Sequence, residues 1–152
     1  MIRYLSLSKR HGYKFAIFFL DLNSFKPIND TYGHEVGDLV LERVAERLKT
    51  LFRESDLMAR AGGDEFMVAA LNIVGSSDVD ILVERIKQVI GEPMEELLSS
   101  AGATPLVPSD VSLNVGVSVG VAVFPGDGDT VEGLIEYADQ QMYVDKRNIS
   151  VD

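Results

Sequence analysis

The fold is decided by residues 15–21, FAIFFLD, in which six apolar residues lead to the carboxylate of Asp21. A run this short, rich in aromatic and branched side chains and closed by an acid, is typical of a fully buried β-strand. It is far too short to cross a bilayer, and no charged and then apolar signal segment precedes it. We therefore expect a fully buried strand that stops at Asp21.

Helical patterns lie on both sides of this strand. Apolar residues recur at helical spacing over residues 36–52 and from Val79 to Ile90, which predicts two amphipathic helices. A helix over Ile2–Arg10 is expected to stop at Gly12, and a last helix is expected to run through Leu134 and Met142.

Extended patterns fill the remaining stretches. Strands are predicted over Leu57–Ala61 and Phe66–Leu71, joined as a hairpin by the Gly-Gly-Asp-Glu turn at residues 62–65, and over Val111–Phe124. Residues 92–110 contain prolines and a glycine and are interpreted as a helical turn and a loop. The order strand, helix, hairpin, helix, strand predicts an α+β fold with a ferredoxin-like βαββαβ core, an antiparallel sheet with helices on one face, and additional helices.

Composition excludes several classes of function. The length and a hydrophobic share of 46% fit a single domain over residues 1–152. The net charge is −10 and the basic residues are scattered among the acids, so no nucleic-acid partner is expected and a phosphate ligand would need a metal ion. Without cysteine, a cytoplasmic or cytoplasm-facing location is expected, with no membrane contact within these residues.

Carboxylates are predicted to converge where the first strand ends. If that strand neighbours the hairpin, Asp64 and Glu65 at the hairpin tip lie beside Asp21. Crowded carboxylates repel each other, and a hard divalent cation relieves the repulsion. Gly62 and Gly63 would let a flat ligand approach the turn. The alternative is a Gly-Gly hairpin whose acids are simply solvated.

Polar residues follow between the strand and the long helix. Leu22 to Lys26 would form a loop of backbone N–H groups, in which Lys26 is either suited to phosphate or an ordinary surface lysine. Asn29, His34 and Asp38 lie before or in the first turn of the helix, where Asn and Asp commonly serve as caps.

Four segments together resemble one family. Residues 19–38 read FLDLNSFKPINDTYGHEVGD, residues 60–66 read RAGGDEF, residues 117–125 read VSVGVAVFP, and residues 138–146 read ADQQMYVDK. The chain thereby resembles a GGDEF domain of the diguanylate cyclase family. The resemblance implies a nucleotidyl-cyclase or polymerase-palm-like fold. It also implies that an antiparallel homodimer, with one GTP on each subunit, forms cyclic di-GMP and pyrophosphate.

The resemblance also implies roles for individual residues. Mg²⁺, or Mn²⁺ in its place, would be held by Asp21, the Leu22 carbonyl and Asp64, and Asp64 or Glu65 would help to deprotonate the ribose 3′-hydroxyl. Asn29 and Asp38 would contact the guanine edge, with His34 nearby. Lys26 and Lys146 would contact the phosphates.

A product-inhibition site is implied by Arg53-Glu-Ser-Asp56, placed shortly before Gly62. Arg53 and Asp56 would bind cyclic di-GMP, and Arg85 matches a further arginine of this site in some members. The alternative is a solvated pair at a helix end for Arg53 and Asp56, and an ordinary surface charge for Arg85.

Departures from the family pattern keep a second function open. The usual opening Asp-x-Leu-Thr stretch is absent, so we interpret the chain as a fragment of a larger signalling protein. Residues 147–151, RNISV, stand where a Gly-Arg-Asn is usual, which favours a regulatory module that binds GTP or cyclic di-GMP and controls a neighbouring phosphodiesterase domain. A purely structural dimerisation domain would leave the clustered acids unexplained.

Overall fold

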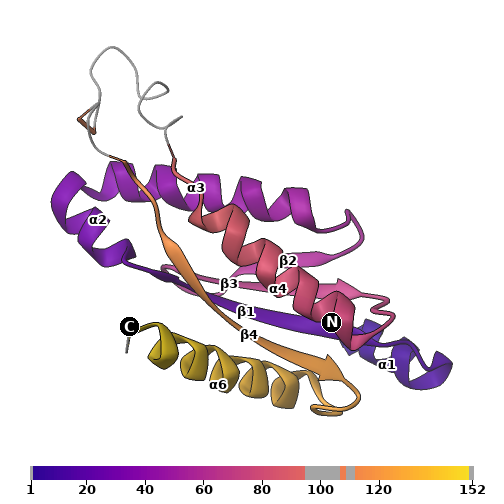
Figure 1. Ribbon diagram of the computed structural model, residues 1–152. Helices are drawn as coiled ribbons and strands as arrows, with labels where there is room; N and C mark the ends of the chain where they lie inside the picture. Colours follow the sequence, from indigo (N-terminus) through magenta and orange to yellow (C-terminus); the bar gives the residue numbers. More distant parts are fainter. Residues whose placement is uncertain (1, 95–106, 109–111, 151–152) are drawn as a thin grey trace.

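The computed structural model describes residues 2–94, 107–108 and 112–150 (Figure 1). Most of the turn and loop expected at residues 92–110, together with Val111, lies outside the described residues. In chain order the elements are α1 (Ile2–His11), β1 (Phe15–Asn23), α2 (Phe25–Tyr32), α3 (His34–Leu51), β2 (Leu57–Arg60), β3 (Glu65–Leu71), α4 (Ser76–Gly91), β4 (Gly116–Phe124) and α6 (Val131–Ser150).

Strand β1 is central in a four-stranded antiparallel sheet of order β2-β3-β1-β4. Its first residue, Phe15, pairs with Leu71 of β3 on one side and with Phe124 of β4 on the other. With α3 and α4 as the connections, this is the predicted α+β fold with a βαββαβ core. The expected fold class is confirmed.

Helices cover both faces of the sheet, so the expectation that they lie on one face is wrong. Phe18 and Leu20 of β1 belong to a core with α3 and α4, whereas Phe15 and Ile17 belong to a core with α1 and α6. Successive side chains of a strand point to opposite faces, and an uninterrupted apolar strand therefore requires a helical layer on each face. Figure 1 shows α6 on the side of the sheet away from α3 and α4.

Helix α6 packs closely on β4. A Cβ at Gly120 of β4 would collide with the backbone of α6 at Ala138 and Met142, so only glycine allows this approach. On the side of α6 that faces the sheet, Leu134 and Ala138 are fully buried. The contact places the C-terminal end of α6 over β4, where Lys146 reaches Asp21 of the neighbouring strand β1.

Strand β1 is longer than predicted. The ladder continues through Asp21 to Asn23, which pairs with Gly116, so Asp21 does not end the strand. Only Ser24, with a left-handed φ of 65°, separates β1 from α2, and the loop expected over Leu22–Lys26 is therefore replaced by strand, turn and helix. Strand β4 begins at Gly116 rather than at Val111.

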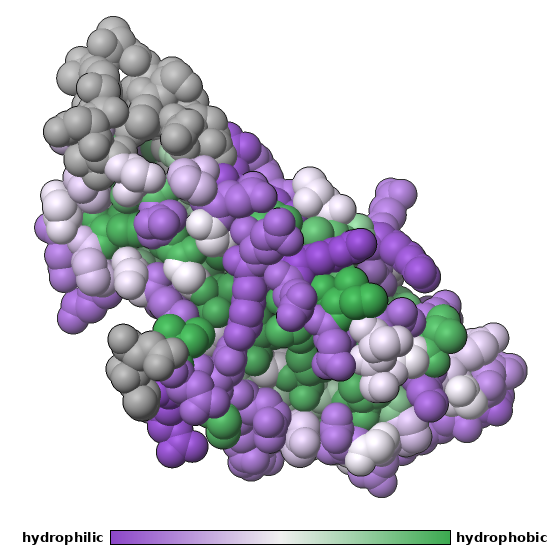
Figure 2. Space-filling model, in the orientation of Figure 1, coloured by the Kyte–Doolittle hydropathy of each residue, from purple (hydrophilic) through white to green (hydrophobic). Residues whose placement is uncertain are grey.

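The outer surface of this domain is mixed in polarity. On the face of Figure 2, hydrophilic side chains lie around and between hydrophobic ones. Among the described helices, none combines the length and the apolar character needed to cross a membrane.

Candidate active site

Strand register alone brings three acidic residues together. Asp21 of β1 pairs with Glu65, the first residue of β3, and Asp64 precedes Glu65 at the tip of the β2–β3 hairpin. The backbone N–H of Leu22 donates a hydrogen bond to the Asp64 carbonyl at 3.0 Å. The predicted approach of the hairpin tip to Asp21 is confirmed.

Asp21 is the most buried of the three acids, with 7% of its surface exposed. Its Oδ2 accepts a hydrogen bond from Lys146 Nζ of α6 at 2.8 Å. Its Oδ1 is buried and has no hydrogen-bond partner among the described residues. Such an atom is costly to bury, so Oδ1 is an open position for a cation or a donor that the described residues do not supply.

The acids also change one another's proton affinity. Burial, and then the charge of Asp21, raises the pKa of the Asp64 carboxyl group. Burial, and then the charges of Asp21 and Asp64, raises the pKa of Glu65. The hydrogen bond to Asp21 raises the pKa of Lys146 and keeps this side chain cationic. Lys146 therefore offsets only part of the negative charge, which favours a further cation here.

The oxygen atoms at this place fit a divalent cation that also binds a phosphate ligand. Within the described parts of the chain, no three His, Cys, Asp or Glu side chains converge closely enough to hold a metal ion alone. Glu65 Oε2 turns back to Gly62, where an added Cβ would lie 3.0 Å away. Asp21 Oδ1, Asp64 and the Leu22 carbonyl remain as candidate ligands, and Mg²⁺ commonly takes one or two carboxylates and completes its shell with substrate phosphates and water.

The other predicted substrate residues come from α2 and the start of α3. Lys26 is exposed on the first turn of α2, and Asn29 is half-buried further along the same helix. His34 and Asp38 are exposed near the beginning of α3. Helix α2 was not predicted, because its Pro, Asn, Asp and Thr residues are typical of a loop.

Asn29 is packed against α3 rather than capping it. Gly33 is the N-cap of α3, and the Asn29 carbonyl accepts a hydrogen bond from Gly33 N at 2.9 Å. Asn29 Oδ1 occupies the space that a Cβ would need at Gly37, and this buried oxygen has no hydrogen-bond partner among the described residues. Like Asp21 Oδ1, it is a polar atom that the described part of the fold leaves unsatisfied.

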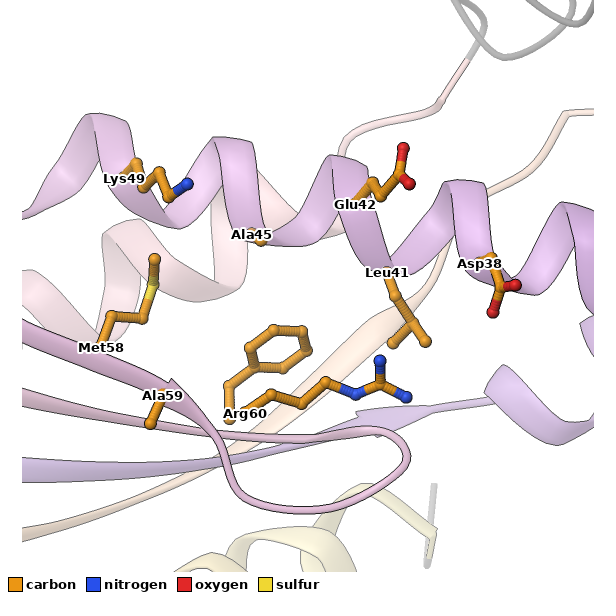
Figure 3. A pocket seen from close by; sticks show the side chains of 9 residues that line it. Asp38, Leu41, Glu42, Ala45, Lys49, Met58, Ala59 and Arg60 are labelled. Carbon is orange, nitrogen blue, oxygen red and sulfur yellow. The ribbon is translucent and has the colours of Figure 1, made fainter.

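A groove of about 570 Å³ runs between α3 and β2 beside the hairpin (Figure 3). Asp38, Glu42 and Lys49 line it from α3, and Met58 and Arg60 line it from β2. Figure 3 shows the Arg60 guanidinium extending towards Leu41 and Asp38. The volume is in the range of small-molecule sites. Of the predicted guanine-binding residues, Asp38 lines this groove.

Arg60 also supports the hairpin tip. Its Nε donates hydrogen bonds to the carbonyl oxygens of Gly62 and Gly63, each at 3.0 Å. This residue and Glu42 were not identified from the sequence. The available signals were the position of Arg60 just before a Gly-Gly turn and the spacing of Glu42, one helical turn after Asp38.

The three residues of the predicted inhibition site line a second pocket. Arg53, Asp56 and Arg85 border a cavity of about 390 Å³ between α4 and the end of the hairpin opposite its tip. Asp56 is not a solvated partner of the Arg53 guanidinium. Its Oδ2 accepts a hydrogen bond from Arg53 N at 2.8 Å, and its Oδ1 accepts one from Leu71 N at 2.9 Å.

Comparison with known proteins identifies this arrangement of strands, hairpin and acids. Residues 3–150 match the family described as "Diguanylate cyclase, GGDEF domain". The chain belongs to the GGDEF family. The diguanylate cyclase TpbB of Pseudomonas aeruginosa is 34% identical to this GGDEF domain over 145 residues, which cover 95% of the chain and 31% of TpbB.

Another relative carries two activities in its name. MucR of Pseudomonas aeruginosa, a bifunctional diguanylate cyclase/cyclic di-GMP phosphodiesterase, is 37% identical over 134 residues, covering 88% of this chain and 18% of MucR. The GGDEF domain described here therefore spans less than a third of the length of either relative.

Solved GGDEF domains have the same fold. The GGDEF domain of PA1120 (YfiN or TpbB) from Pseudomonas aeruginosa superposes with a TM-score of 0.83 at 32% identity, covering 96% of this chain and 84% of that one. The GGDEF domain of DgcB from Caulobacter crescentus, solved in complex with c-di-GMP, gives a TM-score of 0.77 at 26% identity, covering 96% and 80% of the two chains.

Proposed function

We propose that this GGDEF domain is a Mg²⁺-dependent diguanylate cyclase that converts two GTP molecules into cyclic di-GMP and two pyrophosphates. The observation that carries the proposal is Asp21 Oδ1, a buried carboxylate oxygen without a partner among the described residues, next to Asp64 and Glu65 with their raised pKa values. In each of two equivalent steps, the ribose 3′-oxygen of one GTP bonds to the α-phosphorus of the other, pyrophosphate leaves, and the 3′-proton passes to a base.

Asp21, Asp64 and the Leu22 carbonyl would hold Mg²⁺, and Mn²⁺ would accept the same oxygen ligands. When bound, the ion supplies charge stabilisation to the reacting phosphate and makes the 3′-hydroxyl more acidic. Lys146, 2.8 Å from Asp21 Oδ2, is close enough to the acids to contact a phosphate oxygen of bound GTP. Lys26, exposed at the start of α2, would provide a second phosphate contact.

Asp64 or Glu65 would accept the proton of the 3′-hydroxyl. A general base works best when its pKa is close to the working pH, and burial together with neighbouring acids moves both pKa values in that direction. Glu65, whose side chain folds over Gly62, would have to turn towards the substrate to take this role.

The guanine base would bind at the end of the groove near Asp38, where α2 and the start of α3 meet. Asp38 lines the groove, and a carboxylate accepts hydrogen bonds from the N–H groups of a guanine edge. Asn29, whose amide oxygen has no partner among the described residues, and His34 at the start of α3 would add polar contacts. Each subunit of an antiparallel homodimer would hold one GTP, so the two half-sites meet only when two domains face each other.

Product inhibition would use the pocket of Arg53, Asp56 and Arg85. Two arginines beside a cavity of about 390 Å³ suit the phosphates and guanine edges of cyclic di-GMP. We expect Arg85→Ala to weaken inhibition without changing the initial rate. Arg85 is preferable to Asp56 for this test, because the Asp56 carboxylate also holds two backbone N–H groups.

The alternative is a regulatory module that binds GTP or cyclic di-GMP and controls a neighbouring phosphodiesterase domain. The separation of the Arg53 pocket from the acidic site supports it, because a ligand could bind the pocket without any chemistry at the acids. MucR, whose name includes a phosphodiesterase activity, is much longer than this chain.

The experiment measures cyclic di-GMP formed from GTP and Mg²⁺ by the wild-type protein, Asp64→Asn and Glu136→Gln. Glu136 is an exposed acid of α6 and serves as the matched charge control. We expect Asp64→Asn to lose at least about 100-fold in rate and Glu136→Gln to keep it. Metal-dependent GTP binding by a confirmed dimer that forms no product would favour the regulatory module.

A further inference from the structure

Asp145 of α6 joins three elements with one carboxylate. Its Oδ2 accepts a hydrogen bond from Val119 N of β4 at 2.9 Å. Lys87 Nζ of α4 lies 2.8 Å from Oδ2 and 3.0 Å from Oδ1 of the same group. Helices α4 and α6 lie on opposite faces of the sheet, so the Lys87–Asp145 pair connects the two helical layers around one edge of it.

The edge position of β4 explains why this link can form. An edge strand has N–H groups that no neighbouring strand accepts, and the sheet order places β4 at the edge. Asp145 accepts a hydrogen bond from one of these groups, the N–H of Val119. Lys87 then offsets the negative charge, so the Asp145 carboxylate has a cationic partner on α4.

The link lies one residue from the candidate active site. Lys146, which follows Asp145, donates its hydrogen bond to Asp21, and Ser118, which precedes Val119, is the β4 partner of Asp21 in the sheet. Asp145 thus ties α6 to β4 one position along from Asp21. Lys146 is a long side chain, and 45% of it is exposed. Holding it on Asp21 costs conformational entropy, and this cost is smaller when the helix backbone that carries Lys146 is already fixed.

We propose that Lys87 and Asp145 are positioning residues that hold the end of α6 on the edge of the sheet, so that Lys146 stays at Asp21 and is ready for the phosphates of the nucleotide. The nucleotide part of this inference rests on the proposed function. The contact of Lys146 with Asp21 does not.

Two probes separate the consequences. A Mn²⁺ ion alone competes with the Lys146 ammonium for Asp21, so releasing Lys146 should tighten Mn²⁺ binding. A non-reactive GTP analogue with a methylene group between the α- and β-phosphorus atoms should bind more weakly, because its phosphates lose a cation. We expect changes of about three- to tenfold in these opposite directions in Lys87→Met and in Asp145→Asn, which keeps an acceptor for Val119 N.

A double-variant cycle with Lys146→Met distinguishes positioning from general stability. If Lys87 acts through Lys146, Lys87→Met adds nothing to either dissociation constant once Lys146 is already Met. The control is Glu46→Gln, which removes an ion pair with Arg43 elsewhere on the surface, 2.9 Å in length, and should leave both constants unchanged.

Folded Lys87→Met protein with unchanged constants for both probes overturns the proposal, even if its melting temperature is lower. Full additivity with Lys146→Met overturns it as well. Should Asp145→Asn fail to fold, Lys87→Met still provides the test, because it leaves the Val119 hydrogen bond in place. Wild-type protein that binds Mn²⁺ but not the analogue contradicts the proposed function, while the Mn²⁺ arm still decides on the positioning role. Wild-type protein that binds neither overturns both.

Discussion

The β2–β3 hairpin has an aspartate at each end, and the two carboxylates have different surroundings. Asp56, just before β2, accepts hydrogen bonds from two backbone N–H groups, at 2.8 and 2.9 Å. Asp64, at the tip, is beside Asp21, and burial together with that charge raises its pKa. One carboxylate stabilises the fold, whereas the other is held at a cost that a bound cation would offset.

Asp56→Ala should cause the largest loss of stability. Removing a charged acceptor leaves Arg53 N and Leu71 N without their partner, and hydrogen bonds to charged groups are worth about 1.5–3 kcal/mol each. We expect the free energy of unfolding, measured by urea denaturation, to fall by about 3 kcal/mol. Glu54→Ala, which replaces an exposed acid two residues away, is the control. A loss for Asp56→Ala no larger than for Glu54→Ala would show that the two hydrogen bonds of Asp56 do not stabilise the fold.

Arg60→Met tests the support of the tip. The substitution keeps much of the apolar stem and removes the donor to the carbonyl oxygens of Gly62 and Gly63. We expect a loss of about 1 kcal/mol in unfolding free energy, since the bonds are largely exposed. Amide hydrogen exchange should become faster at the tip and remain unchanged in β1. Equal acceleration in both places would show that Arg60 has no local role.

Asp64→Asn should stabilise the fold, whereas Asp56→Ala should destabilise it. Without metal, the substitution removes repulsion with Asp21, and the melting temperature should rise by no more than about 3 °C. Asp80→Asn, at an exposed position of α4, controls for the general effect of removing one negative charge. A lower melting temperature for Asp64→Asn than for Asp80→Asn would remove the contrast between the two ends.

The smallest expected effect is the pH dependence of the difference in melting temperature between Asp64→Asn and the wild type. A carboxyl group whose pKa is raised on folding binds more protons when folded than when unfolded, so its unfavourable contribution is present above the raised pKa and fades as the pH falls through it. The advantage of Asp64→Asn should therefore shrink on acidification. Thermal melts of both proteins across the acidic range measure it, and an advantage that grows towards low pH would reverse the sign.

Much of this architecture was predictable from local patterns. The strand over Phe15–Leu20 was found as a short apolar run, the amphipathic helices by the helical spacing of their apolar residues, and the hairpin by its Gly-Gly turn. The position of the acids followed from placing the hairpin beside β1. The second helical layer was implied by an apolar strand buried on both faces, but it was not recognised.

Other features depend on contacts between distant segments. Helix α2 has a loop-like composition, and its place against α3 depends on packing that includes Asn29 over Gly37. The backbone bonds of Asp56 join it to Leu71, 15 residues away, and no local pattern shows them. The Lys87–Asp145 pair spans 58 residues and two faces of the sheet. The roles assigned to the site residues stay predictions, since they depend on ligands.

The most direct test of the proposed cyclase activity is the rate of cyclic di-GMP formation per chain, measured from GTP and Mg²⁺ over a series of protein concentrations with wild type and Asp64→Asn. We expect the wild-type rate per chain to rise with concentration, because two half-sites must meet, and the rate of Asp64→Asn to stay at least about 100-fold lower at every concentration. Absence of product at concentrations where the wild-type chain is dimeric, or equal rates for the two proteins, would contradict the proposed cyclase activity.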